Sequence, residues 1–114
     1  MAETKRIGIV VGTRPEAIKM APVIYELGAR VGTLEPIIIS TAQHRQMLDQ
    51  VFRVFQISPD HDLNVMQPNQ TLSATVQRIL GEMETLLPNL GLDCLLVQGD
   101  TTTAFAAALA AFYQ

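Results

Sequence analysis

The sequence has only one cysteine, Cys94, among its 114 residues. A single cysteine excludes an internal disulfide, and a chain without disulfides is typical of the reducing cytoplasm, where we expect this protein. Histidine is also scarce. His44 has no cysteine beside it and no second histidine nearer than His61. This spacing does not support a metal site, and we expect none.

Apolar runs long enough to enter a membrane are missing as well. Residues 1–6 are polar and charged, and no apolar signal core follows them, so we expect neither a leader nor a membrane span. The net charge of −3 and an isoelectric point near 5.2 argue against nucleic acid as a general partner, because such binding needs a basic face. This net charge does not exclude a local binding site for an anion. The length and the 48% hydrophobic residues indicate a soluble globular piece of one domain at most.

The turn after the first apolar segment has a single glycine. Residues 7–11 (IGIVV) are rich in β-branched side chains and predict a buried strand, after which Gly12 leads into a helical pattern. One glycine excludes both the dinucleotide fingerprint and the phosphate loop of nucleotide hydrolases. The order of strand, turn and helix nevertheless predicts the start of an α/β domain.

The start of this first helix carries a capping pattern and two basic residues. Thr13 and Glu16 have the spacing of a capping box, and Pro15 lies in the first turn, where its missing N–H costs nothing. The free N–H groups and Arg14 favour an anion at the strand's carboxyl end. Lys19 lies about 140° further round the helix, so only its long stem brings it to the same ligand. The alternative is a capped helix with both cations solvated.

The first helix runs towards Gly28, and Pro22 predicts a kink or a break in it. Residues 37–39 (III) predict a second parallel strand, covered on both faces. Polar residues follow that strand, and such a strand end is where open α/β sheets bind ligands. Gln43, His44 and Gln46 are therefore candidate hydrogen-bonding partners for a ligand. The alternative is that Thr41 caps a helix reaching to about residue 55 and that His44 is a surface residue.

The second half of the chain repeats the alternation of helix and strand. Residues 71–87 carry one apolar stripe of helical spacing, and residues 93–98 predict a strand in which Cys94 is buried. Asp100 then stands at a strand's carboxyl end and a helix's start, as Arg14 does, although a plain helix cap is the alternative role. The alanine-rich helix that follows is apolar on nearly all sides, which predicts cover on nearly all sides.

Four segments in chain order resemble the bacterial non-hydrolysing UDP-N-acetylglucosamine 2-epimerases. The similarity extends over nearly the whole chain. The matching segments are residues 12–22 (GTRPEAIKMAP), 41–50 (TAQHRQMLDQ), 62–66 (DLNVM) and 99–103 (GDTTT).

The resemblance implies a GT-B-type fold of two Rossmann-like domains facing across a cleft. Residues 1–114 then correspond to an incomplete N-terminal domain with a partial parallel sheet flanked by helices, and the second domain is absent from this chain. Residues 62–64 are implied to form a brief strand. We therefore expect an N-terminal fragment that is inactive by itself, while family members are commonly homodimers.

The family's reaction inverts carbon 2 of UDP-N-acetylglucosamine by eliminating UDP and adding it back, without a cofactor. By resemblance, Arg14 and Lys19 match substrate-contacting basic residues, and Asp100 matches the first acidic active-site residue. The other acid and base residues of the family fall beyond residue 114.

A regulatory site is also implied by the resemblance. Gln43 and Gln46, with His44 between them, match positions linked to a second, regulatory UDP-N-acetylglucosamine, while Asn69 stands where some members have an arginine. The competing interpretation of the whole chain is a free-standing, non-catalytic module that binds a nucleotide sugar or phosphate.

Overall fold

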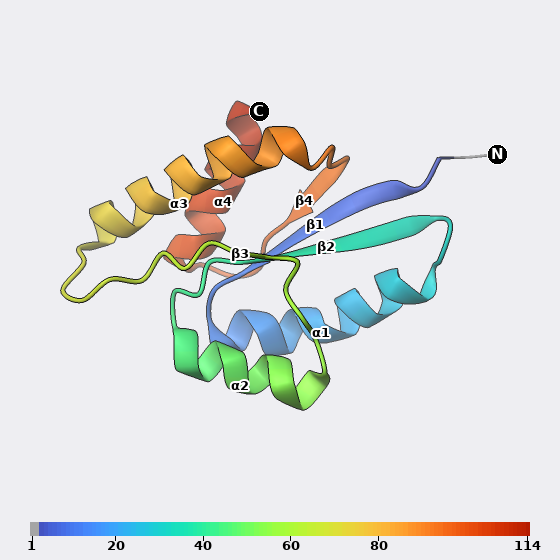
Figure 1. Ribbon diagram of the computed structural model, residues 1–114, viewed down its shortest axis with the longest axis horizontal. Coiled ribbons are helices and arrows are strands. Elements are labelled where there is room, and N and C mark those ends of the chain that lie inside the picture. Colours follow the sequence, from blue (N-terminus) through green and yellow to red (C-terminus); the bar gives the residue numbers. More distant parts are fainter. Residues whose placement is uncertain (1–2) are drawn as a thin grey trace.

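Four parallel strands form a central sheet in the order β3-β2-β1-β4 (Figure 1). The computed structural model describes residues 3–114. The parallel sheet with flanking helices confirms the predicted α/β class. The strands are β1 (Lys5–Val11), β2 (Leu34–Ser40), β3 (His61–Asp62) and β4 (Cys94–Leu96).

The helices cover both faces of this sheet. Helices α1 and α2 pack on one face and α3 and α4 on the other (Figure 1). The predicted helices at residues 71–87 and after Asp100 are both present. The helical segments are α1 (Arg14–Ala29), α2 (Arg45–Phe55), α3 (Leu72–Leu86), the 3₁₀ turn η1 (Leu87–Asn89) and α4 (Thr102–Tyr113).

The central strands are apolar on both sides because both sides are covered. Alternate residues of a strand point to opposite faces. Ile9 and Ile38 therefore pack with α1 and α2, whereas Val10 and Ile39 pack with α3 and α4. This two-sided burial explains the continuous apolar runs that predicted parallel strands.

Helix α1 is continuous through Pro22, so a break at this residue is wrong. Pro22 lies on the exposed side of the helix. The carbonyl that loses its partner there, that of Ile18, can bond to water instead. The buried side, with Met20 and Ile24 packed on the sheet, holds the two halves of the helix in line.

Cys94 is exposed, and its predicted burial is wrong. It is the first residue of β4, which is paired only with β1 among the described strands. Burial increases from Cys94 to Leu95 and Leu96 along this strand. The apolar run correctly predicted a strand, but it did not show that the strand lies at the edge of the sheet.

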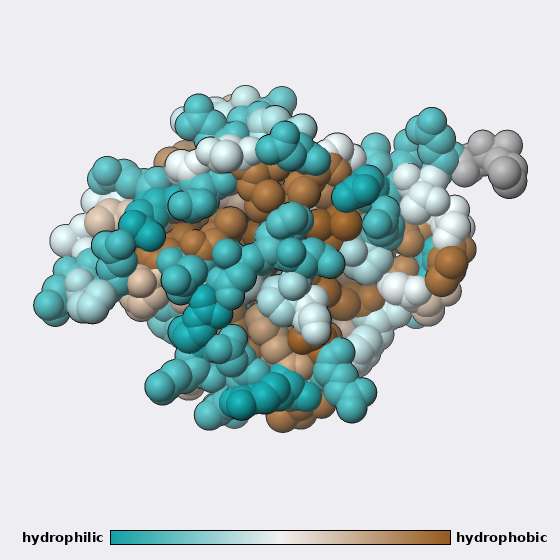
Figure 2. All heavy atoms as spheres, in the orientation of Figure 1, coloured by the Kyte–Doolittle hydropathy of each residue, from teal (hydrophilic) through white to brown (hydrophobic). Residues whose placement is uncertain are grey.

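Helix α4 is buried on one side only. Ala106, Ala107 and Ala110 pack against the sheet, whereas Phe105 is 61% and Phe112 83% exposed. Residues 3–114 therefore cover only one side of α4, whereas its sequence predicts packing on nearly all sides. Figure 2 also shows apolar surface between α3 and the strands.

No helix formed by residues 3–114 has both the length and the hydrophobicity needed to cross a membrane.

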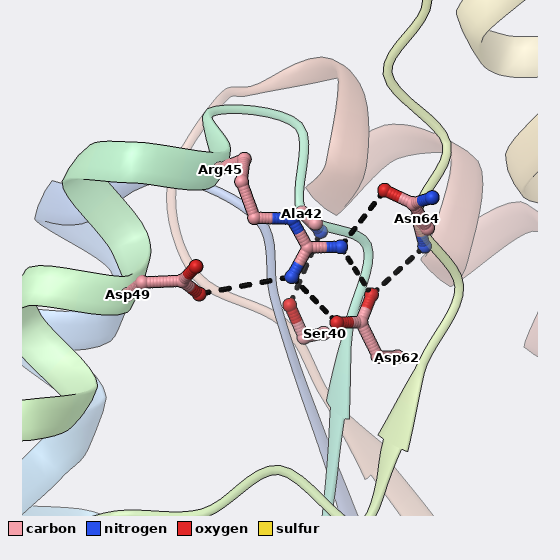
Figure 3. A network of polar contacts seen from close by, with 6 residues as sticks. All are labelled: Ser40, Ala42, Arg45, Asp49, Asp62 and Asn64. Carbon is pink, nitrogen blue, oxygen red and sulfur yellow. Dashed lines mark hydrogen bonds and ion pairs between the residues drawn. The ribbon is translucent and has the colours of Figure 1, made fainter.

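An ion-pair network fixes the loop between β2 and α2 (Figure 3). The Arg45 guanidinium donates to both oxygens of Asp62, at 2.6 and 2.9 Å, and to Asn64 Oδ1 at 2.8 Å. Asp49 lies 3.7 Å from the same guanidinium. The hydrogen bond from Arg45, assisted by the backbone N–H of Asn64, lowers the pKa of Asp62 below its ordinary value, and the same bond raises the pKa of Arg45. The loop is thereby tied to β3.

Our first prediction concerns Gly12, where a side chain has no room. A Cβ there would lie 2.0 Å from Thr41 Oγ1 and 2.3 Å from Thr103 Oγ1, both of which are buried. Gly12→Ala should lower the free energy of unfolding by about 1–3 kcal/mol, the usual cost of overpacking. Urea denaturation measures the change.

Gly81 provides the matched control. It lies inside α3, and a Cβ there meets nothing within 4 Å. Gly81→Ala should stabilise the protein by about 0.5–1 kcal/mol, since alanine favours helix more than glycine does. Equal effects of the two substitutions would contradict the packing described for Gly12.

The second prediction concerns Asp62 and pH. Because its pKa is lower in the folded state, its contribution is fully present well above the ordinary value of 3.8 and is lost as pH falls through the folded pKa. More than a third of each partner side chain is exposed, so Asp62→Asn should destabilise by about 1 kcal/mol or less at neutral pH.

The stability difference should shrink as the solution is acidified below pH 3.8, as urea titrations at several pH values can test. Asp49→Asn is the control, because its longer contact to Arg45 predicts a smaller loss. If Asp62→Asn lowers the free energy of unfolding equally at every pH, the ion pair is not the cause of the loss.

Candidate functional site

The sheet has its topological switch point between β1 and β4. The chain runs from β1 to β2 and β3 on one side, and then crosses to β4 on the other side of β1. Ligands of open α/β sheets bind outside the carboxyl ends of the strands at such a point. Gly12 and Thr13 follow β1 there, and Asp100 and Thr101 follow β4.

A buried carboxylate connects these two strand ends. Glu16 is 1% exposed, and its Oε1 accepts the backbone N–H groups of Gly12 and Thr13 at 2.8 and 2.9 Å. Its Oε2 accepts the hydroxyl of Thr101, from the start of α4. Glu16 thus makes its half of the predicted capping box and also binds a residue 85 positions away. The anion at this helix start is therefore the chain's own carboxylate.

Asp100 is not the cap of α4, so the capping interpretation of this residue is wrong. The cap is Thr101, whose hydroxyl accepts the N–H of Ala104 at 3.1 Å. Asp100 is exposed, and its side chain makes no hydrogen bond or ion pair within residues 3–114. Its carboxylate is therefore available to a ligand at the strand end.

Arg14 and Lys19 are exposed cations of α1. Neither forms an ion pair within the part of the chain that the structure describes. Arg14 is the first residue of α1 and lines an open hollow with Ile18 and residues of α2. Lys19 lies about 7.5 Å further along the helix and about 140° round it. The structure therefore brings the helix starts that carry Arg14 and Asp100 together, while Lys19 reaches this region only through its stem.

Threonine hydroxyls fill the space beside Gly12. Thr41 and Thr103 lie 2.9 Å apart through their Oγ1 atoms, and Thr103 donates to Gln43 Oε1 at 2.7 Å. Thr41 therefore does not cap α2, as the alternative interpretation had it, since the N-cap position belongs to His44. The hydroxyls join the end of β2 to the first turn of α4, beside Gly12.

Gln43, His44 and Gln46 share a second region. Together with Arg45, Met47 and Met66 they line an open hollow beside the loop in Figure 3. His44 and Gln46 are exposed, and Gln43 is half-buried. Asn69 is exposed and is not among the residues that line this hollow. The described residues include no cluster of three or more His, Cys, Asp or Glu side chains placed to hold a metal ion.

Sequence reasoning missed the connecting residues of the first region. The Glu16 capping box is visible in the sequence, but nothing there pairs Glu16 with Thr101. The run of residues 101–103 (TTT) was the available signal, because Thr101 is the N-cap and Thr103 bonds to Thr41 after β2.

Known proteins match nearly the whole of this chain. A family model described as UDP-N-acetylglucosamine 2-epimerase matches residues 27–114. A curated UDP-N-acetylglucosamine 2-epimerase of Neisseria meningitidis serogroup A is 55% identical over 105 residues, which are 92% of this chain and 28% of that protein. A curated relative of Escherichia coli strain K12, with the same name, is 53% identical over the same shares of the two chains.

Solved structures show the same fold. A putative UDP-N-acetylglucosamine 2-epimerase of Listeria monocytogenes superposes with a TM-score of 0.92 at 46% identity, covering all of this chain and 30% of that one. The Neisseria meningitidis enzyme bound to UDP-GlcNAc gives 0.87 at 53% identity, covering 96% of this chain and 30% of that one. The chain spans about 28% of the length of the curated relatives cited. With a family model matched over most of its residues, the chain belongs to the UDP-N-acetylglucosamine 2-epimerase family.

Proposed function

We propose that this chain forms the first part of the N-terminal Rossmann-like domain of a GT-B-type UDP-N-acetylglucosamine 2-epimerase. The observation that carries the proposal is the contact between the starts of α1 and α4. Within residues 3–114, the start of α1 carries the unpaired cation Arg14, and the start of α4 carries the carboxylate of Asp100, which does not cap that helix. The relatives' names and the UDP-GlcNAc bound in the Neisseria structure support the choice of substrate.

In the proposed reaction, UDP-N-acetylglucosamine and UDP-N-acetylmannosamine interconvert in two steps. Carbon 2 loses its proton while the bond from carbon 1 to the diphosphate oxygen breaks, which gives UDP and an unsaturated sugar. UDP then adds back to carbon 1 as a proton returns to the opposite face of carbon 2. Protons and electrons balance within the substrate, so the reaction uses no redox cofactor.

Two kinds of group are needed for this chemistry, and this chain offers both. The departing diphosphate needs cations, for which we assign Arg14 and Lys19, because charge-assisted contacts stabilise the charge that develops in the transition state. Proton transfer needs positioned acids and bases, and we assign Asp100 as one of these. Further acid and base groups and the second domain would come from sequence outside these 114 residues.

We also propose a regulatory substrate site at the hollow lined by Gln43, His44 and Gln46. Their amides and imidazole offer hydrogen bonds to a second UDP-N-acetylglucosamine. A homodimer of the whole enzyme and a cytoplasmic location complete the proposal, which involves neither nucleic acid nor a membrane.

The proposal predicts that the 114-residue chain alone does not epimerise UDP-N-acetylglucosamine. Catalytic acid and base groups act as a unit, so one of them without the others accelerates the reaction little. Chromatography of the nucleotide sugars after long incubation measures turnover. Formation of UDP-N-acetylmannosamine above a blank without protein would contradict the proposed division of the site.

The same proposal predicts activity in a chimera. This chimera joins residues 1–114 to the part of the Neisseria meningitidis relative that follows its aligned segment. Arg14→Ala in the chimera should raise the barrier measured by kcat/KM by about 2–4 kcal/mol, the scale of a lost charged contact in a dry site. Its thermal stability should be unchanged, since Arg14 is exposed and unpaired within the described residues.

Arg53→Ala is the matched control for this substitution. Arg53 is an exposed arginine in the last turn of α2, away from the carboxyl ends of the strands. It should leave kcat/KM unchanged within about twofold. A folded chimera without activity, or equal losses from both substitutions, would refute the assigned role of this sheet edge and favour a non-catalytic binding module.

A further inference from the structure

Glu16 is a buried carboxylate to which the proposed reaction gives no role. Within residues 3–114 it has no cationic partner, although it is 1% exposed. Its charge is met instead by two backbone N–H groups, one hydroxyl and the positive ends of two helices. A group buried in this way at the switch point is more than the cap of one helix.

We propose that Glu16 is a positioning residue that, through Thr101, sets the place of Asp100 relative to Arg14. This inference rests on the proposed function. It adds a residue that touches no substrate but determines the distance between the cation for the diphosphate and the acid or base that serves carbon 2.

The chain connections around Glu16 support this role. Oε1 holds the turn of Gly12 and Thr13, and Arg14 is the next residue. Oε2 holds Thr101, and Asp100 is the residue directly before it. Arg14 is therefore connected to Asp100 through the backbone to Glu16, one hydrogen bond from Thr101 to Glu16, and the peptide bond between Thr101 and Asp100.

Within residues 3–114, Glu16 makes the hydrogen bond between α1 and the start of α4, while the next polar contact of that turn, Thr103 with Thr41, ties it to the end of β2. Helices α1 and α4 lie on opposite faces of the sheet, so their side chains do not pack together in one core. Gly99, before Asp100, has a φ of +80°, a backbone conformation that favours glycine. Asp100 thus lies between this glycine turn and Thr101, whose bond to Glu16 is the side-chain contact nearest to it along the chain.

Thr101 uses both hydrogen-bonding capacities of its hydroxyl in this arrangement. It donates to Glu16 and accepts the N–H of Ala104. Thr71 makes the same cap on α3, accepting the N–H of Ala74 at 3.1 Å, but has no contact with Glu16. The chain therefore contains a threonine that shares the capping role and lacks the positioning role.

The experiment compares these two threonines in the chimera defined above. Thr101→Val should lower kcat by roughly 10- to 100-fold, the scale of a displaced catalytic group, while KM changes by less than about threefold, since Arg14 stays in place. Thr101→Ser restores the hydroxyl and should keep kcat within about twofold. Thr71→Val should lower the thermal midpoint by the loss of a cap alone, with kcat unchanged, whereas Thr101→Val should lower it further because it also removes a donor from the buried Glu16.

Glu16→Gln is the second variant. Its amide keeps one oxygen for the backbone N–H groups but replaces the other by NH₂, which can only donate to the Thr101 oxygen, so a neutral bond replaces the charge-assisted one. It should lower kcat less than Thr101→Val does, and the double variant should lose less than the sum of the two single losses, because both changes act on one bond. If Thr101→Val does not fold, the same criteria apply to Glu16→Gln.

Three results would overturn the inference. They are an unchanged kcat in Thr101→Val, an equal loss of kcat in Thr71→Val, and additive losses in the double variant. An active parent chimera with any of these leaves the proposed function standing. A folded parent chimera without activity instead refutes the proposed function itself, so the two failures are distinguishable.

Discussion

The structure depends on a carboxylate buried where two helices begin. Glu16 binds the turn after β1 and Thr101, the N-cap of α4. A buried anion costs free energy unless donors surround it, and the donors here are the N–H and hydroxyl groups that helix starts and strand ends leave unpaired. Buried hydrogen bonds thus hold the strand ends together at the switch point, while apolar packing holds the helices on the two faces of the sheet.

Much of the fold follows from the sequence. The apolar runs of β1 and β2, the helical stripe of α3 and the alanine-rich run of α4 are local patterns, and each produced the predicted element. The parallel order of the strands also follows, because strands that alternate with helices need crossover connections. The positions of Arg14 and Asp100 at strand ends came directly from this alternation.

The wrong predictions have a common cause, which is that they depend on contacts that are not local in sequence. Cys94 is exposed because β4 lies at the edge of the sheet, and Pro22 leaves α1 intact because it faces away from the core. The alternative interpretations put Thr41 and Asp100 at N-cap positions that His44 and Thr101 occupy. The first two errors concern the side of an element that a residue faces, and the last two concern the residue that starts a helix; both depend on partners distant in sequence. The same holds for the bond from Glu16 to Thr101, the link in the candidate site that no local pattern reveals.

Arg45 has a consequence for the hollow that it lines. Its guanidinium is committed to Asp62 and Asn64, with Asp49 close by, so its positive charge is balanced inside the protein. The surface beside it presents the amides of Gln43 and Gln46 and the thioethers of Met47 and Met66. A ligand bound in this hollow would meet hydrogen-bonding groups and thioethers instead of a free guanidinium, so salt would weaken its binding little.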